Sequence, residues 1–308
     1  MAQVEQRPGS GDLERSTWRT MRDYVAITKP RIIELLLVTA IPTMILAARG
    51  WPQPVTAAAV IVGGMLAAAG ANAYNSVYDR DIDAMMARTH SRPVATGAVS
   101  VRGGIILATT LSVASVVVLA VLANVLAAAL AVVAIAFYAV GYTMLLKRRT
   151  SQNIVWGGAA GCMPVLIAWA AVTGGLTWTP VVLFLIVFWW TPPHYWPLSL
   201  RFRDDYAAAG VPMLPVVTDV RSVTRSIVIY AWVMVFTSLA LIPVAPMGWV
   251  YAAAAVVLGA VFLVEAHLLR RRALSGSEDV RPMRLFHWSI TYLALLFLAV
   301  AVDPFVTA

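Results

Sequence analysis

The chain of 308 residues is 60% hydrophobic and only 12% charged, a composition far outside the range of soluble globular domains. Its net charge of +8 does not indicate nucleic-acid binding, because there is no soluble domain to carry a basic stripe. These values are instead typical of a protein that crosses a membrane several times.

The N-terminal segment, residues 1–28, is polar and mixed in charge, with Pro8, Gly9 and Gly11 near its start. We expect it to be disordered. No signal peptide is visible, because no apolar core begins until after Arg31 and the apolar run that follows is too long to be cleaved off. Residues 29–308 form the predicted membrane domain.

Nine near-continuous apolar segments follow, each long enough to span the hydrocarbon core of a bilayer. They lie at about 31–49, 55–76, 104–122, 126–146, 154–172, 179–198, 226–244, 249–268 and 286–302. The only cysteine, Cys162, lies inside the fifth segment, so there is no disulfide framework and no thiolate metal site. The sequence therefore predicts an all-α, polytopic membrane protein of nine transmembrane helices.

Lys and Arg residues are distributed unevenly between the two sides of these segments. Of 23 such residues, only Arg49 falls on one side, and the others fall in the N-terminal segment and in the loops after the second, fourth, sixth and eighth segments. By the positive-inside rule the basic side is cytoplasmic. We therefore expect a cytoplasmic N-terminus and an outside C-terminus in a bacterial-type inner membrane.

An acidic motif ends the second segment. Asn75, Asp79 and Asp83 are spaced by four residues, and because each such step on a helix drifts only roughly 40°, the three side chains share one face. Oxygen ligands of this kind suit Mg²⁺, which is usually held by one or two carboxylates and substrate phosphates. The alternative is a helix end decorated with solvated acids. Against it stands the cost of collecting Asp79, Asp81 and Asp83 beside a membrane without a cation.

Basic residues accompany the motif on the same side of the membrane. Arg88 and Arg92 follow within reach of the acidic face, and Lys147, Arg148 and Arg149 end the fourth segment. Their charges suit a diphosphate group. The cluster at 147–149 is equally typical of residues that only set topology, and the residue types alone leave both roles open.

The sixth segment ends in three prolines, Pro192, Pro193 and Pro197, around His194. We expect this run to break the helix, and a broken backbone at membrane depth is tolerated where it is buried in protein or lines a cavity. His194 is therefore predicted to face a cavity, although an imidazole there can also satisfy a freed carbonyl group. No histidine pair has metal-ligand spacing, so a zinc site is not expected. The next loop carries the charged residues Arg201, Arg203, Asp204 and Asp205.

With these motifs the chain resembles the UbiA-type intramembrane prenyltransferases, whose mark is Asn-x-x-x-Asp-x-x-x-Asp at the end of the second helix. Asn75, Asp79 and Asp83 meet that pattern. Further matching pieces, which resemble the superfamily members that act on haem, lie at 28–31, 78–83, 86–89, 92–93, 146–150, 153–154, 193–194, 205–206 and 209–215.

One departure concerns the loop after the sixth segment. Many members of the superfamily carry a second Asp-x-x-x-Asp motif there, whereas this chain offers Asp204 and Asp205, with Tyr206 in the place of a further acid. A second fully acidic Mg²⁺ site is therefore in doubt, which leaves the charges of this loop available for another ligand.

The resemblance implies transfer of a farnesyl group from farnesyl diphosphate to a vinyl group of protohaem IX (haem b), with addition of water, on the route to haem A. It implies Mg²⁺ held by Asn75, Asp79 and Asp83, which also act as the catalytic residues. Haem b is then a substrate, and haem A synthase or oxidase assembly proteins are expected partners. The implied diphosphate-binding residues are Arg88, Arg92, Lys147, Arg148 and Arg149, and the implied haem-binding residues are His194, Arg201, Arg203, Asp204 and Asp205.

Two other functions are compatible with parts of this pattern. The nearer is the same chemistry on an aromatic or quinone-precursor acceptor, which is distinguished by the product formed. The more distant is a membrane transporter, because broken helices and intramembrane acids also occur in transporters. The acids of this chain gather at one membrane face and not at the midplane, which argues against transport.

Overall fold

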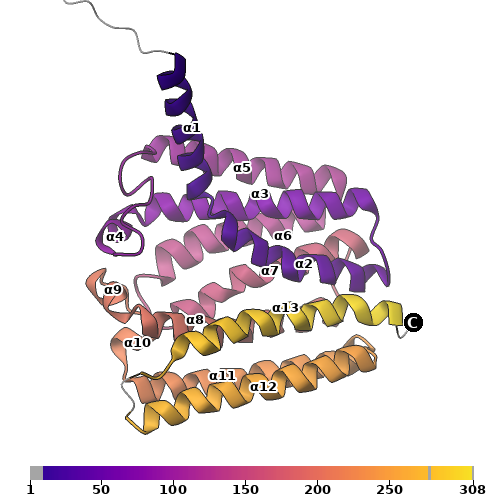
Figure 1. Ribbon diagram of the computed structural model, residues 1–308. Helices are drawn as coiled ribbons and strands as arrows, with labels where there is room; N and C mark the ends of the chain where they lie inside the picture. Colours follow the sequence, from indigo (N-terminus) through magenta and orange to yellow (C-terminus); the bar gives the residue numbers. More distant parts are fainter. Residues whose placement is uncertain (1–9, 277–278, 307–308) are drawn as a thin grey trace, which may run out of the picture.

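The computed structural model describes residues 10–276 and 279–306, which contain helices and their connections and no β-strand. The long helices lie side by side in one bundle, and short helices cover one end of it (Figure 1). The long helices are α2 (Pro30–Ala48), α3 (Pro54–Tyr78), α5 (Val101–Leu122), α6 (Val125–Ala136) continued by the π-helix η1 (Phe137–Leu146), α7 (Asn153–Thr173), α8 (Trp178–Arg201), α11 (Val220–Val244), α12 (Trp249–Leu274) and α13 (Pro282–Val306).

Seven spans in the described part of the chain are long and apolar enough to cross a bilayer. They are α3, α5, α6 with η1, α7, α11, α12 and α13. In α2 the apolar portion found among the described residues, Leu36–Ala48, is shorter than a full span, and α8 is rich in proline and in tryptophan, which lower its mean hydropathy. The all-helical membrane fold is confirmed, whereas the total of nine crossings stays a prediction.

Small residues allow α3 and α5 to pack closely together. A side chain at Gly70 of α3 would meet Ser112 of α5, and one at Gly63 would meet Leu119. The hydroxyl of Ser115 donates a 2.6 Å hydrogen bond to the carbonyl of Gly63. Close contact between helix backbones through small residues is common in membrane proteins. This contact holds α3, the helix that carries the acidic motif, against α5.

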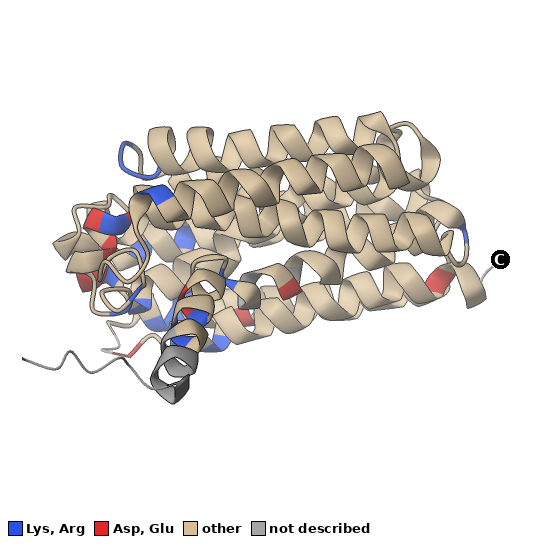
Figure 2. Cartoon of the chain, turned by 90° about the horizontal axis from the view of Figure 1, so that it is seen from above, with Lys and Arg blue, Asp and Glu red and all other residues tan. Residues whose placement is uncertain are grey.

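The charged residues gather at one end of the bundle, which we call the basic end (Figure 2). The short helices α4 (Arg80–Met85), α9 (Arg203–Ala208) and α10 (Leu214–Val217) lie at this end. The C-terminal end of α13 lies at the opposite end (Figure 1). There Asp303 is buried and accepts hydrogen bonds from the backbone of Gly248 and Tyr251, which caps α12.

The described part of the N-terminal segment is helical, and the expectation of disorder stays a prediction for the rest of it. Residues Ser10–Ile27 form helix α1, and residues 1–9 lie outside the described part. The end of α1 is fastened to α3, because Ser76 donates to the carbonyl of Ile27 and Asn72 donates to that of Thr28. Ile27 itself is buried, and this apolar contact stabilises the helix.

Helix α8 is continuous, so the expectation that its prolines break it is wrong. Pro192, Pro193 and Pro197 all lie inside Trp178–Arg201. The φ angle of proline is compatible with a helix. Each proline removes one backbone hydrogen bond because it lacks an N–H group, and here the helix continues without that bond. All three prolines are buried, and α8 packs against α7, α11 and α13, so its backbone is held by protein on several sides.

Candidate active site at the basic end

The acidic motif lies where α3 ends and α4 begins. Asp79 is the residue between the two helices, and the backbone stays in helical register across it. The amide of Asp79 donates to the carbonyl of Asn75 at 2.9 Å, and that of Asp83 donates to the carbonyl of Asp79 at 2.8 Å. The side chains are almost fully buried, with exposed fractions of 3% for Asn75, 0% for Asp79 and 2% for Asp83.

The amide nitrogen of Asn75 is oriented by hydrogen bonds to two neighbours. Its amide nitrogen donates to Asp79 Oδ2 at 2.7 Å and to the hydroxyl of Thr143 at 3.1 Å. Thr143 lies in η1, whose wider turns are the kind of irregularity that is frequent at functional sites. The hydroxyl of Thr143 in turn donates to the carbonyl of Tyr138, five residues earlier. Thr143 and Tyr138 were not predicted from the sequence as site residues.

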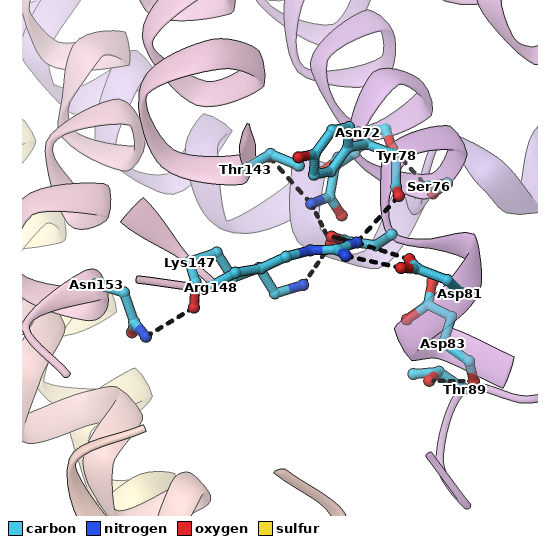
Figure 3. A network of polar contacts seen from close by, with 12 residues as sticks. Asn72, Ser76, Tyr78, Asp81, Asp83, Thr89, Thr143, Lys147, Arg148 and Asn153 are labelled. Atoms are coloured by element: carbon cyan, nitrogen blue, oxygen red, sulfur yellow. Dashed lines mark hydrogen bonds and ion pairs between the residues drawn. The ribbon is translucent and has the colours of Figure 1, made fainter. Parts of the chain in front are cut away.

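Two cations from the end of η1 cover the motif (Figure 3). Lys147 forms an ion pair with Asp79 Oδ2. Arg148 lies 3.6 Å from Asp79 Oδ1 and makes a two-pronged ion pair with Asp81, with distances of 2.7 and 2.6 Å. The hydrogen bonds from Arg148 lower the pKa of Asp81 to about 2. Arg149 is exposed and makes no ion pair with any described residue.

The loop after α4 brings two further arginines to the site. Nη1 of Arg92 lies 2.7 Å from both carboxylate oxygens of Asp83. Arg88 is directed toward Tyr206, with 3.5 Å between its Nη2 atom and the phenol oxygen. That phenol lies 2.8 Å from the hydroxyl of Tyr195 on α8. In place of a second acidic motif, α8 and α9 thus each contribute one tyrosine to a hydrogen-bonded pair.

Lys29 is the main site residue that the sequence reasoning missed. Its Nζ atom donates a 2.5 Å hydrogen bond to Asn75 Oδ1. Its backbone has φ of 54° and ψ of 62°, a left-handed conformation that is uncommon for a residue other than glycine and that accompanies function in many proteins. Its position directly before Pro30, at the start of the first apolar segment, is the signal that could have indicated it.

Cations therefore crowd around the two buried carboxylates of the motif. Burial, with smaller contributions from the charges of Arg92 and Lys147, lowers the pKa of Lys29 to about 7. Repulsion among like charges of this kind is relieved by an anionic ligand. The arrangement suits a phosphate-bearing substrate at the membrane surface.

Comparison with known proteins identifies the family of this chain. The chain matches the UbiA prenyltransferase family over residues 36–290. It belongs to that family. It is 57% identical over 286 residues to the protoheme IX farnesyltransferase of Clavibacter michiganensis, covering 93% of each chain. It is 52% identical over 314 residues to the protoheme IX farnesyltransferase of Streptomyces coelicolor, covering 99% of each chain.

Solved structures of UbiA proteins share the fold. A structure of digeranylgeranylglyceryl phosphate synthase superposes with a TM-score of 0.76 at 16% identity, covering 92% of this chain and 98% of that one. A UbiA homologue from Archaeoglobus fulgidus, bound to GPP and Mg²⁺, superposes with a TM-score of 0.62 at 15% identity, covering 91% of this chain and 100% of that one. The chain is thus an integral membrane prenyltransferase with the UbiA fold.

An apolar cavity of the UbiA fold leads away from the acidic motif into the bundle. Asn72 and Tyr138 line its polar end, and the Tyr138 hydroxyl lies 3.4 Å from Asn72 Oδ1. The remaining lining comes from α2, α3, α6 and α7 and is almost entirely apolar, with small residues such as Gly64 and Gly161. Asn72 lies three residues before Asn75 on α3, so the polar end of this cavity lies about one helical turn from the motif.

His194 is not among the residues that line this apolar cavity, and the expectation that it faces a cavity stays a prediction. It lies between the rings of Trp190 and Phe286, with centroid distances of 4.1 and 4.8 Å. Its Nδ1 atom lies 2.6 Å from the hydroxyl of Ser289 on α13. The structure therefore gives the imidazole ring a packing role, while no hydrogen bond to a described residue involves Nε2.

The charges of the loop after α8 lie apart from the acidic motif. Arg201, Arg203 and Asp204 are exposed, and Asp205 is half-buried. None of the four makes an ion pair with a described residue. The structure thus brings Arg88, Arg92, Lys147 and Arg148 into the site described above, and leaves the predicted haem-binding residues of α9 at the surface of the basic end.

The oxygen atoms of the motif are compatible with Mg²⁺ as ligands. Oδ1 of Asp79 is buried and has no hydrogen-bond donor among the described residues, so it is an open acceptor suited to a cation. The described residues contain no group of three His, Cys, Asp or Glu side chains close enough to hold a metal. Asp79, Asp83 and Asn75 would hold Mg²⁺ together with oxygens of the substrate, as is usual for this ion.

Proposed function

We propose that this chain transfers the farnesyl group of farnesyl diphosphate to a vinyl group of protohaem IX, with addition of water, giving haem O and pyrophosphate. The observation that carries the proposal is the identity of 52–57% over nearly the full chain to proteins named protoheme IX farnesyltransferase. A site of buried acids and surrounding cations above an apolar cavity supports it independently.

The diphosphate binds among the cations of the site. Lys147, Arg148 and Arg92 are already held against Asp79, Asp81 and Asp83, and their long side chains need only small movements to reach phosphate oxygens. Mg²⁺, when bound, supplies further positive charge against the departing pyrophosphate. The basic side chains stabilise the charge that develops as the C1–O bond of farnesyl diphosphate breaks.

The farnesyl chain occupies the apolar cavity between α2, α3, α6 and α7. The cavity excludes water, which protects the allylic cation until the acceptor attacks. Tyr138 lines the cavity, its ring lies 5.5 Å from that of Tyr142, and the faces of both rings suit a carbocation. A vinyl carbon of haem then forms a bond to C1, and water adds to the resulting cation and releases a proton.

The acceptor approaches from the side of α8 and α9. Arg201 and Arg203 are exposed there and can pair with the haem propionates. His194 retains a ring nitrogen that bonds no described residue, which suits contact with the haem iron or a vinyl group. Asp204 and Asp205 complete the proposed haem surface. Tyr195 and Tyr206 lie between this surface and Arg88.

We place the basic end at the cytoplasmic face of a bacterial inner membrane, following the positive-inside rule. The asymmetry of charge between the two ends supports this orientation (Figure 2). Residues 29–308 then form one intramembrane prenyltransferase domain. Its product is the precursor of haem A, so haem A synthase and oxidase assembly proteins are the expected partners.

Reconstitution of the purified protein tests the proposal. The protein is supplied with farnesyl diphosphate, haem b and Mg²⁺, and the extracted haem is analysed by mass spectrometry. The expected product is haem b plus one farnesyl group and one hydroxyl group, the hydroxyl coming from water. Prenylation of 4-hydroxybenzoate or homogentisate in parallel reactions, with haem unchanged, would overturn the assignment in favour of a quinone-precursor acceptor.

A further inference from the structure

Helix α1 carries an uncovered apolar face. Trp18, Met21 and Val25 have exposed fractions of 72%, 56% and 56%. Their spacing of three and four residues puts them on one side of the helix. The described part of the chain does not cover these side chains. Because a stripe of large apolar groups is unfavourable in water, its natural contact lies outside this protein.

The orientation of α1 indicates what that contact is. Figure 1 shows α1 running crosswise to the long helices and extending beyond α5, close to the basic end. Its C-terminal part is fixed to the bundle, since Ile27 is buried and Tyr24 packs beside Gly103. A helix that lies across a bundle of spanning helices near their ends lies along the membrane surface.

The charges of α1 match that location. Arg19 and Arg22 are exposed, and neither forms an ion pair with a described residue. At about 100° per residue, Arg22 lies roughly 40° and Arg19 roughly 100° from Trp18 on the same side of the stripe, so Arg22 borders the stripe and Arg19 lies further around the helix. An apolar face bordered by arginines is the pattern of helices that lie in the interface of an anionic membrane.

We propose that α1 is an interfacial helix that rests on the anionic lipid surface at the basic end. Trp18, Met21 and Val25 enter the boundary between headgroups and acyl chains, and Arg19 and Arg22 contact lipid phosphates. The occupant is lipid because the stripe continues an apolar surface. Ile105 and Ile106, at the start of α5 on which α1 packs, are also exposed.

This docking has a consequence for the site, which rests on the proposed function. Lys29 follows the end of α1 by two residues, and α3 holds the carbonyls of Ile27 and Thr28 through Ser76 and Asn72. A helix fixed to the lipid surface therefore keeps the left-handed Lys29 beside Asn75. Loss of docking is expected to raise the farnesyl diphosphate concentration required, without changing the haem product.

A depth measurement on the full chain tests the docking itself. Met21→Cys in a Cys162→Ala background is labelled with the fluorophore NBD and reconstituted into vesicles of phosphatidylcholine with phosphatidylglycerol. The matched control is Thr20→Cys, which points roughly 130° away from the centre of the stripe. We expect spin-labelled lipids to quench the probe at 21 and aqueous iodide to quench the probe at 20. Equal access of iodide to both positions would overturn the proposal.

The anionic lipid is tested by charge removal. Each of Arg19→Gln and Arg22→Gln is expected to lower the ratio of docked to undocked helix about fivefold in vesicles with phosphatidylglycerol. In vesicles of phosphatidylcholine alone the two substitutions should have no effect. Equal loss in both lipids would refute the role assigned to the arginines. Because the readout is probe depth and not turnover, an inactive or differently acting enzyme leaves this result intact.

Discussion

The ammonium nitrogen of Lys29 lies 2.5 Å from the Oδ1 atom of Asn75. This contact joins the start of α2 to the end of α3 and occupies the Asn75 oxygen that we propose as a ligand of Mg²⁺. Lys147 and Arg92 occupy oxygens of Asp79 and Asp83 in the same way. We therefore expect these three cations to leave the motif and move onto the diphosphate when Mg²⁺ and substrate bind.

Replacement of Lys29 with Met should weaken farnesyl diphosphate binding. A hydrogen bond to a charged group contributes about 1.5–3 kcal/mol, so the concentration for half-maximal rate should rise by roughly 10-fold to 150-fold. Lys29→Arg, which keeps the charge, is the control and should lose less. Unchanged substrate dependence in the Met variant would mean that Lys29 only stabilises the fold, and thermal unfolding would then be the property that changes.

Substitutions in the basic cluster at the end of η1, residues 147–149, should affect activity differently according to position. Lys147→Gln is expected to reduce kcat/KM at least tenfold, because Lys147 is paired with the buried Asp79 beside the diphosphate. Arg149→Gln is the matched control, since Arg149 is exposed and should change the rate by less than about twofold. Both proteins are assayed after a topology test with an impermeant label. Equal losses in the two variants would contradict the geometry.

Asp79→Asn and Asp83→Asn should each abolish turnover in a folded, inserted protein. Each change removes a charge that would hold Mg²⁺ against the pyrophosphate, and losses of about 10²–10³ in kcat are usual when one such group is removed. Haem O formation is measured across a Mg²⁺ titration, and chelation of Mg²⁺ should abolish it in the parent protein. Normal haem O production by either variant would rule out the assigned roles.

Filling the cavity should change the preferred length of the prenyl chain. Gly64 lines the cavity, and a Cβ atom there would meet no atom within 4 Å, so Gly64→Leu projects into open space without strain. We expect use of geranyl diphosphate relative to farnesyl diphosphate to increase about tenfold or more. Gly175→Ala, outside the cavity, is the control. An unchanged preference would place the prenyl chain elsewhere.

Removal of the His194 imidazole should separate haem binding from diphosphate binding. His194→Ala is expected to lose haem affinity or to shift the haem absorption band, while farnesyl diphosphate binding stays unchanged. Ser289→Ala removes only the partner of Nδ1 and measures the structural part of the effect. A His194→Ala protein that titrates haem like the parent would assign the residue to packing between Trp190 and Phe286.

Local pattern was sufficient for much of this fold. Runs of apolar residues predicted the membrane helices, because crossing a bilayer demands length and hydropathy that any window of the sequence reveals. Spacing by four placed Asn75, Asp79 and Asp83 on one face, because helical periodicity is local. The same local reasoning failed for α8, where packing on several sides holds a helix through three prolines.

The pairing of charges was decided by tertiary structure alone. Lys29 meets Asn75 across 46 residues, and Lys147 meets Asp79 across 68. Sequence alone could not sort Lys147 and Arg148, which face the motif, from Arg149, which faces away. Such contacts depend on how α2, η1 and α3 pack, and the apolar residues that drive this packing carry no signal for which cation meets which carboxylate.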